Sequence, residues 1–355
     1  MKHRRTACVL PLLLATAIPS AEMHAHPDHE QPVDHAADGA HHTVAGQAGQ
    51  PARPSRDRPR RERMEPVELP QPEVTVTIED GYRVIRSNGL PSHSTGSFPN
   101  AGNPNAIRAQ SHERRLPLVP RIAEEPIVAR PEFGIALNGV IFDAGTGEFW
   151  TATNSRAFGG GSEWNYEALG GGVPLGLDSN HAHVQQSGKY HYHGVPTGLL
   201  EQLKEAKGDG VMIHVGWAYD GFPIYAGWGH DEPGDAASPM KVLTSSYQLK
   251  AGERPESPEG PGGPYDGTFG LDYEYVEGSG DLDECNGRFG VTPEFPHGTY
   301  YYVITPEFPS IPRLWKGEPD DSIGGARDQQ RQNRPRRRGG PGPRGEGPGE
   351  GAPRR

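Results

Sequence analysis

Four histidines lie close together in the segment NHAHVQQSGKYHYHG, residues 180 to 194. They form two His-x-His pairs, His181 with His183 and His191 with His193. On a β-strand, residues i and i+2 point to the same face about 6.5 to 7 Å apart, so each pair can hold a metal ion between its rings. Neutral imidazoles suit zinc, copper or nickel, whereas calcium prefers oxygen ligands and is disfavoured. The segment therefore predicts a transition-metal site, with zinc or copper as the ion.

The turn between the two pairs decides whether they share one site. A two-residue loop would place the pairs on opposite faces of a hairpin. A three-residue loop ending at Gly188 would put that glycine in the left-handed conformation and pair Gln185 with Lys189. We favour this second register, in which His183 faces His191 and all four imidazoles share one face. The alternative is a structural role, in which the rings of one pair bond to nearby carboxylates and carbonyls.

A fifth histidine, His214, lies in the segment GVMIHVGWAYDGFPIYAGW, residues 210 to 228. Val211, Ile213 and Val215 alternate with it, which predicts a strand whose opposite face carries His214. The residue is a candidate additional ligand or proton donor. The competing interpretation is a single polar side chain satisfied within the fold.

Acidic residues crowd the segment GSGDLDECNGRFG, residues 278 to 290. Asp281, Asp283 and Glu284 lack the full calcium-loop spacing, and we expect them to orient or neutralise the histidine site, together with Asp220. Neighbouring acids raise the pKa of a thiol, so Cys285 is disfavoured as a nucleophile. It is the only cysteine that remains once a signal peptide containing Cys8 is removed.

The elements that must position these residues are short strands. Only GLLEQLKEAK, residues 198 to 207, has helical spacing, with Thr197 as the expected N-cap and Gly208 as the stop. Asp220 and Gly221 predict a two-residue hairpin turn. We therefore expect a mainly β fold, a single irregular domain with long loops and one short helix. The expected strands cover residues 74–78, 82–85, 135–142, 211–217, 224–225, 273–276 and 299–305.

Composition and charge exclude several classes of protein. Of 355 residues, 49 are Gly and 37 are Pro, which argues against helical bundles. Residues 66 to 326 hold 35 Asp and Glu against 17 Lys and Arg, a net charge of −18 that disfavours nucleic acid as a partner. No apolar run reaches the ~18 residues of a membrane span.

The two ends of the chain differ from its middle. Residues 1–25 have the basic, apolar and small-residue pattern of a signal peptide, so we expect a secreted or periplasmic protein. A disordered segment, His-rich and then Pro/Arg-rich, is expected over 26–71, the folded domain over 72–318, and a disordered Arg/Gly/Pro-rich tail over 319–355. The His-rich segment is either a metal-capturing tail or a spacer. The basic tail is a candidate for contact with anionic surface polymers, or a solvated linker.

Several blocks together resemble the YHYH domain family over residues 74 to 318. The blocks are SNGLPSHSTGSFPNAGNPN at 87–105, GIALNGVIFDAGTGEFW at 134–150, KYHYHG at 189–194, HVGWAYDGFPIYAGWG at 214–229 and GDLDECNGRFGVTPEFPHGTYYYVITPEFPSIPR at 280–313. The resemblance implies an exported protein of a family without an established activity. It also adds His93, within PSHSTG, to the candidate cluster.

Three functions follow from these observations, and whether the protein is an enzyme stays open. The first is an exported protein that binds a transition metal. The second is a metal-dependent hydrolase of extracellular polymers, with Asp220, Asp283 or Glu284 as the base. The third is a cell-surface carbohydrate-binding or adhesion module, whose groove would be lined by Trp150, Trp164, Trp217 and Trp228.

Overall fold

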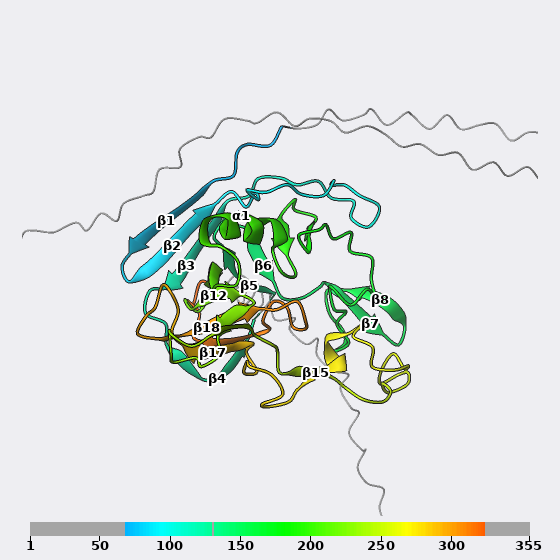
Figure 1. The fold of residues 1–355 in the computed structure, drawn as a ribbon. Coiled ribbons are helices and arrows are strands. Elements are labelled where there is room, and N and C mark those ends of the chain that lie inside the picture. Colours follow the sequence, from blue (N-terminus) through cyan, green and yellow to red (C-terminus); the bar gives the residue numbers. More distant parts are fainter. Residues whose placement is uncertain (1–67, 130, 324–355) are drawn as a thin grey trace, which may run out of the picture. The chain divides into compact units, whose positions relative to one another are not determined.

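The computed structural model describes residues 68–129 and 131–323. In this part of the chain, nineteen short strands accompany one α-helix, α1 (Thr197–Lys207), and one 3-10 helix, η1 (Gly270–Asp272) (Figure 1). The prediction of a mainly β fold with a single short helix is confirmed. The expected signal peptide, the His-rich segment and most of the C-terminal tail lie outside the described residues.

The strands are connected by long loops and run from three to seven residues. In chain order they are β1 (Val74–Glu79), β2 (Tyr82–Ser87), β3 (His112–Pro117), β4 (Ile122–Val128), β5 (Glu132–Ala136), β6 (Ile141–Asp143), β7 (Glu148–Thr151), β8 (Asn154–Phe158), β9 (Ala182–Val184), β10 (Tyr190–Tyr192), β11 (Ile213–Ala218), β12 (Pro223–Ala226), β13 (Trp228–His230), β14 (Met240–Val242), β15 (Tyr247–Leu249), β16 (Tyr273–Tyr275), β17 (Gly287–Gly290), β18 (Thr299–Ile304) and β19 (Leu314–Gly317).

An eight-stranded sheet with the order β17-β18-β12-β11-β5-β6-β10-β9 forms the centre of the fold. It is mixed, because β6 runs parallel to β10 and β12 runs parallel to β18, whereas the other neighbours are antiparallel. Its inner strands are almost entirely buried, which explains their continuous apolar and aromatic sequences. Leu199 of α1 packs into the same core. The strands β9 and β10 lie at one end of this sheet.

Five smaller sheets surround it, namely β1-β2-β3, β19-β4, β7-β8, β13-β14 and β15-β16. The expected pairing of the first two strands is confirmed, with Val76 opposite Ile85. Asp80 and Gly81 both have positive φ angles, 47° and 84°, which is the geometry that two-residue hairpin turns require.

Two predictions about turns were wrong. The single strand expected over residues 135–142 is two strands, β5 and β6, because the chain turns at Gly139, whose φ is +80°. The turn after β11 has three residues instead of two, since the Ala218 amide bonds to the Phe222 carbonyl at 2.9 Å. In both cases a glycine with positive φ marks the turn, and Gly221 has this role in the second.

The helix α1 ends as expected and begins differently. Gly208 stops it with a φ of +88°, and its amide bonds to the Lys204 carbonyl at 2.7 Å. At the other end Pro196 is the N-cap residue and no side chain caps the helix. The Thr197 hydroxyl instead donates to the Val195 carbonyl at 3.4 Å, so the predicted cap was wrong.

Candidate metal centre

The hairpin of β9 and β10 has the three-residue loop expected from the sequence. The Gln185 amide bonds to the Lys189 carbonyl at 2.9 Å, and Gly188 adopts a φ of +89°. His183 therefore stands directly opposite His191 in the antiparallel register. A one-residue slip would have turned these two rings to opposite faces of the hairpin.

Three histidines converge on one face of this hairpin. They are His183, His191 and His193, here called the histidine triad, and one ring nitrogen from each lies within 4.8 Å of the others. Their ring centroids are 4.7 to 4.8 Å apart in all three pairs. Nε2 of His193 lies 3.1 Å from Nε2 of His183. The described residues contain no other group of this kind with three or more such side chains.

Hydrogen bonds fix the orientation of two of these rings. Nδ1 of His183 donates to the Leu175 carbonyl at 2.8 Å, and Nδ1 of His191 donates to the Lys189 carbonyl at 3.2 Å. Each ring therefore carries its proton on Nδ1 and keeps the Nε2 lone pair free for a ligand. Backbone carbonyls that accept from the second nitrogen are the usual partners of metal-ligating histidines.

Burial keeps the triad neutral. His191 is 1% exposed and His193 is 4% exposed. Removal from water lowers the pKa of His183 and holds the pKa of His191 and His193 well below the ordinary value of 6.5. The rings thus present lone pairs at neutral pH, which is the form that binds transition metals.

The opposite face of β10 anchors the hairpin. The Tyr190 hydroxyl donates to Asp178 at 2.8 Å. The Tyr192 hydroxyl accepts from the Asn138 amide at 2.9 Å and lies 2.5 Å from Nε2 of His93. These bonds tie the strand to loops distant in sequence, so the positions of the triad rings are set by both faces of the hairpin.

A third anchor holds the turn end of β10 to β5. The Lys189 ammonium lies 2.6 Å from Glu132, which also pairs with Arg114 at 2.8 Å and accepts from the Tyr219 hydroxyl at 2.9 Å. Burial of Glu132 acts to raise its pKa, but the two cations outweigh burial and lower that pKa to about 2.

A cavity of about 1180 Å³ opens beside the triad, and we call it the triad cavity. All three triad histidines line it, and so do Asp143 at the end of β6 and Glu148 at the start of β7. Both carboxylates act electrostatically on His183, and Asp143 also acts on His193. Sequence reasoning missed these two acids. The signal that points to Asp143 is its position at the end of a buried strand.

The other predicted histidine ligands are placed elsewhere. His181 has a φ of +53°, and its Nδ1 lies 2.8 Å from the Val195 carbonyl. Nε2 of His214 donates to the Gly216 carbonyl at 2.8 Å, and its ring packs against Trp217. His93 lies on the tyrosine face of β10, against the hydroxyl of Tyr192. Three imidazoles therefore come together, rather than the four or more expected.

The acids predicted to support the site have other partners. Asp220 is buried, accepts from the Tyr302 hydroxyl and the Gly317 amide, and burial raises its pKa to about 6. Asp281 pairs with Lys241 at 2.8 Å. Neither lines the triad cavity.

The remaining members of the acidic segment surround its cysteine. Asp283 accepts from the Tyr300 hydroxyl at 2.8 Å and from the Cys285 amide at 2.9 Å. The Glu284 carbonyl accepts from the Tyr247 hydroxyl. Burial and these acids raise the pKa of the buried Cys285 thiol to about 12, in line with the expectation that it is no nucleophile. Asp283 and Glu284 also lie outside the lining of the triad cavity.

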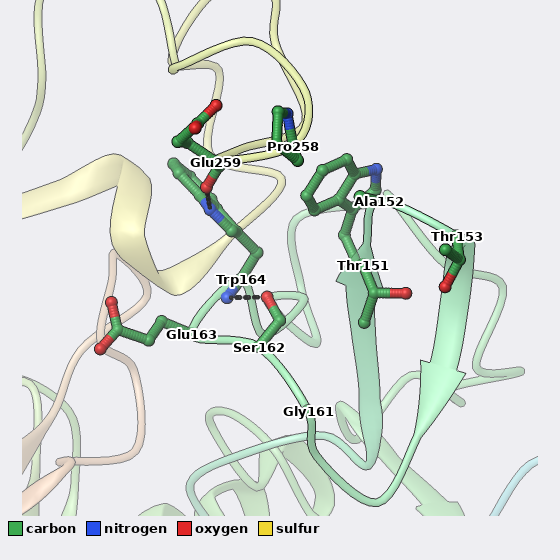
Figure 2. Close-up of a pocket in the computed structure, with 10 residues that line it drawn as sticks. Thr151, Ala152, Thr153, Gly161, Ser162, Glu163, Trp164, Pro258 and Glu259 are labelled. Atoms are coloured by element: carbon green, nitrogen blue, oxygen red, sulfur yellow. Dashed lines mark hydrogen bonds between the residues drawn. The ribbon is translucent and has the colours of Figure 1, made fainter. Parts of the chain in front are cut away.

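A second cavity, of about 450 Å³, lies between β7 and two loops. Figure 2 shows Thr151 and Thr153 on one side of it and Trp164 and Pro258 on the other. Trp150 also lines it. The other two tryptophans of the adhesion hypothesis are placed differently, since Trp217 lies under the Arg83 guanidinium at 3.4 Å and Trp228 belongs to β13. Two of the four thus share a cavity.

Comparison with known proteins identifies the family without adding an activity. No curated protein and no solved structure matches the chain. Among the described residues, no helix combines the length and apolar character that crossing a membrane requires. The family model described as YHYH protein matches residues 113–317, which is more than half of the chain and includes the whole histidine triad. The chain therefore belongs to the YHYH family.

Proposed function

We propose that this chain is an exported metal-binding protein, in which the histidine triad holds one divalent transition-metal ion, zinc or copper. The observation that carries the proposal is the convergence of three neutral imidazoles, two buried and one partly buried, with His193 Nε2 only 3.1 Å from His183 Nε2. Two nitrogens bound to one tetrahedral zinc at 2.0 to 2.1 Å are about 3.3 Å apart. The observed separation is close to that value.

The donor set supports a transition metal over calcium or magnesium. Three imidazole nitrogens and no carboxylate make up the group. Hard cations such as calcium take oxygen ligands, whereas imidazole suits zinc, copper, nickel and iron. The same neutral donors leave the full charge of the ion uncompensated, which favours an anionic fourth ligand.

Export rests on the sequence outside the described residues. Lys2, Arg4 and Arg5 precede an apolar stretch at 7–18, and small residues follow at positions 17, 21 and 25. This order is typical of a secretory signal peptide. We therefore place the metal site in a secreted or periplasmic protein.

A second candidate function, a metal-dependent hydrolase, is favoured by the triad cavity. Catalytic zinc sites commonly use three protein ligands and leave one position open, whereas structural sites are closed by four. The triad supplies three ligands and borders about 1180 Å³ of open space. The carboxylates that line this cavity are Asp143 and Glu148, rather than the acids expected from the sequence. Hydrolysis of an extracellular polymer that is lost when the metal is removed and restored by added zinc would support this function.

The test of metal binding is elemental analysis of the full chain, purified without an affinity tag, beside a His191→Ala/His193→Ala variant. Histidines outside the described residues are common to both proteins, so the difference in metal content reports on the triad. We expect about one equivalent of zinc or copper to be lost in the variant. Equal metal contents in two folded proteins would refute the site.

A further inference from the structure

One triad ring differs from the other two in its second nitrogen. Nδ1 of His193 is buried and has no hydrogen-bond partner. The corresponding Nδ1 atoms of His183 and His191 face backbone carbonyls. Buried polar atoms in folded proteins almost always have a partner, so this exception calls for an explanation.

The hydrogen-bond pattern assigns the proton positions in the metal-free triad. Because His183 holds its proton on Nδ1, its Nε2 is an acceptor, and the contact at 3.1 Å requires His193 to donate from Nε2. Nδ1 of His193 is then a bare lone pair. A metal ion at Nε2 displaces that proton, so the neutral ring must carry it on Nδ1 instead and needs an acceptor there.

The sheet places a carboxylate beside this ring. Strands β6 and β10 are parallel, with Phe142 paired to Tyr192. The next residues along the two strands are Asp143 and His193, on the face opposite the Phe142 and Tyr192 rings, whose centroids are 5.6 Å apart. Asp143 is 3% exposed and, like His193, lines the triad cavity.

Asp143 has acceptor capacity to spare. Its Oδ1 accepts from the Gly145 backbone amide at 3.2 Å, and its Oδ2 accepts from the Gln185 side-chain amide at 3.4 Å. Both bonds are long, and a carboxylate has about four lone-pair sites. No cation is paired with Asp143 among the salt bridges of residues 68–129 and 131–323, so its charge is available to a neighbouring N–H.

We propose that Asp143 is the positioning carboxylate of the metal centre, accepting the Nδ1 proton of His193 when the ion occupies Nε2. The inference rests on the proposed metal site and completes it, because each triad ring then has an acceptor behind it. Such carboxylate–histidine–metal arrangements fix the tautomer, orient the ring and raise the basicity of the ligand. In this chain, the function of the histidines in the segment 190–193 thus depends on an acid from a neighbouring strand.

The test compares three variants of the full chain. Asp143→Ala removes the acceptor, and Asp143→Asn keeps an acceptor while removing the charge. Glu148→Ala removes the other carboxylate of the triad cavity and is the matched control. Zinc affinity is measured by competition with a chromophoric chelator. We expect a roughly 10- to 100-fold loss in Asp143→Ala, a smaller loss in Asp143→Asn, and a change of less than about threefold in Glu148→Ala.

A spectroscopic readout separates this role from a structural one. In the zinc-loaded protein with ¹⁵N-labelled histidine, each triad ring should show an Nδ1 proton protected from exchange. The His193 signal should shift or exchange rapidly in both Asp143 variants, while the His183 and His191 signals stay in place. The Asp143→Asn variant gives this measurement even if Asp143→Ala fails to fold.

The outcomes distinguish this inference from the function on which it rests. Wild-type chain that binds no more zinc than the His191→Ala/His193→Ala variant would overturn the metal site itself. Wild-type zinc binding with equal affinities in the Asp143 and Glu148 variants, and an unchanged His193 signal, would overturn the role of Asp143 alone.

Discussion

The two faces of the β9–β10 hairpin are built from alternating residues and differ in how completely their polar groups are satisfied. On one face, the hydroxyls of Tyr190 and Tyr192 each bond to side chains of other loops. On the other face the histidine triad brings one ring nitrogen from each residue within 4.8 Å of the others, and Nδ1 of His193 has no partner. The tyrosine face satisfies its hydroxyl groups without a ligand, whereas the triad face leaves a buried ring nitrogen without a partner.

Polar residues packed around the same hairpin can therefore have different roles. His93 and Tyr192 satisfy each other, and Lys189 is satisfied by Glu132, so these residues are explained by the fold itself. The hydrogen bonds of the fold satisfy the ring nitrogens of the triad only in part. The convergence of three ring nitrogens beside a buried nitrogen that lacks a partner distinguishes the candidate site from the residues that support it.

The largest effect on stability is expected from the charged residues that anchor the hairpin. Glu132→Gln leaves the buried Lys189 and the partly buried Arg114 without a full counter-charge, which should lower the free energy of unfolding by about 3 to 5 kcal/mol. Urea unfolding at pH 7 measures this loss of stability. Glu113→Gln, at an exposed ion pair with Arg86, is the matched control and should leave the midpoint unchanged. A loss no larger than that of the control would show that the Glu132 network does not hold the hairpin.

The same network predicts the pH dependence of stability. The pKa of Glu132 is about 2 in the folded protein and about 4.5 in the unfolded chain, so the folded state binds fewer protons between these values. Its contribution, about 3 kcal/mol, is fully present above pH 4.5 and is lost as the pH falls toward 2. Urea unfolding from pH 6 to pH 2.5 should show a steeper acid loss in wild type than in Glu132→Gln. Parallel curves for the two proteins would contradict the pKa assignment.

Metal should stabilise the protein through the triad face. At free zinc about 100-fold above the dissociation constant, the folded state gains about 2.7 kcal/mol, which raises the melting temperature. The His191→Ala/His193→Ala variant should lack this zinc-dependent rise. Thermal unfolding with and without zinc, followed by circular dichroism, measures both. An equal rise in the two proteins would assign the effect to histidines outside the triad.

Substitution on the tyrosine face should lower stability without changing metal binding. Tyr192→Phe leaves the Asn138 amide and the His93 ring without their partner, at a cost of about 1 to 3 kcal/mol in unfolding free energy. Zinc content should stay at the wild-type level, because the substitution lies behind the triad and not in it. Loss of metal from a folded Tyr192→Phe protein would show that the two faces are not separable.

The smallest effect is expected at His181. Its ring bonds to the Val195 carbonyl and does not join the triad, so His181→Ala should keep the wild-type zinc affinity within about threefold. Chelator competition measures this directly. A loss comparable with that of a triad variant would return His181 to the ligand set.

Much of the local geometry could be predicted from residue types. Gly188 predicts the left-handed position of a three-residue loop, and the register of that loop places His183 opposite His191. The position of the His181 ring could not be predicted in this way. This residue has a positive φ, and its ring bonds to the carbonyl of Val195, which belongs to a loop after the hairpin. The splitting of residues 135–142 into β5 and β6 was missed because a buried apolar run looks alike in one strand and in two.

The sequence by itself determined the β-rich class, the hairpin with its paired histidines and the membership of the YHYH family, because each depends on residues near one another in the chain. Tertiary structure alone decided which histidines meet and which acids line the cavity beside them. Asp143 and His193 follow neighbouring strands only because β6 and β10 pair in parallel, although the two residues are far apart in sequence. Short-range order follows from local backbone preferences, whereas the chemistry of a site depends on strands that only the folded sheet makes neighbours.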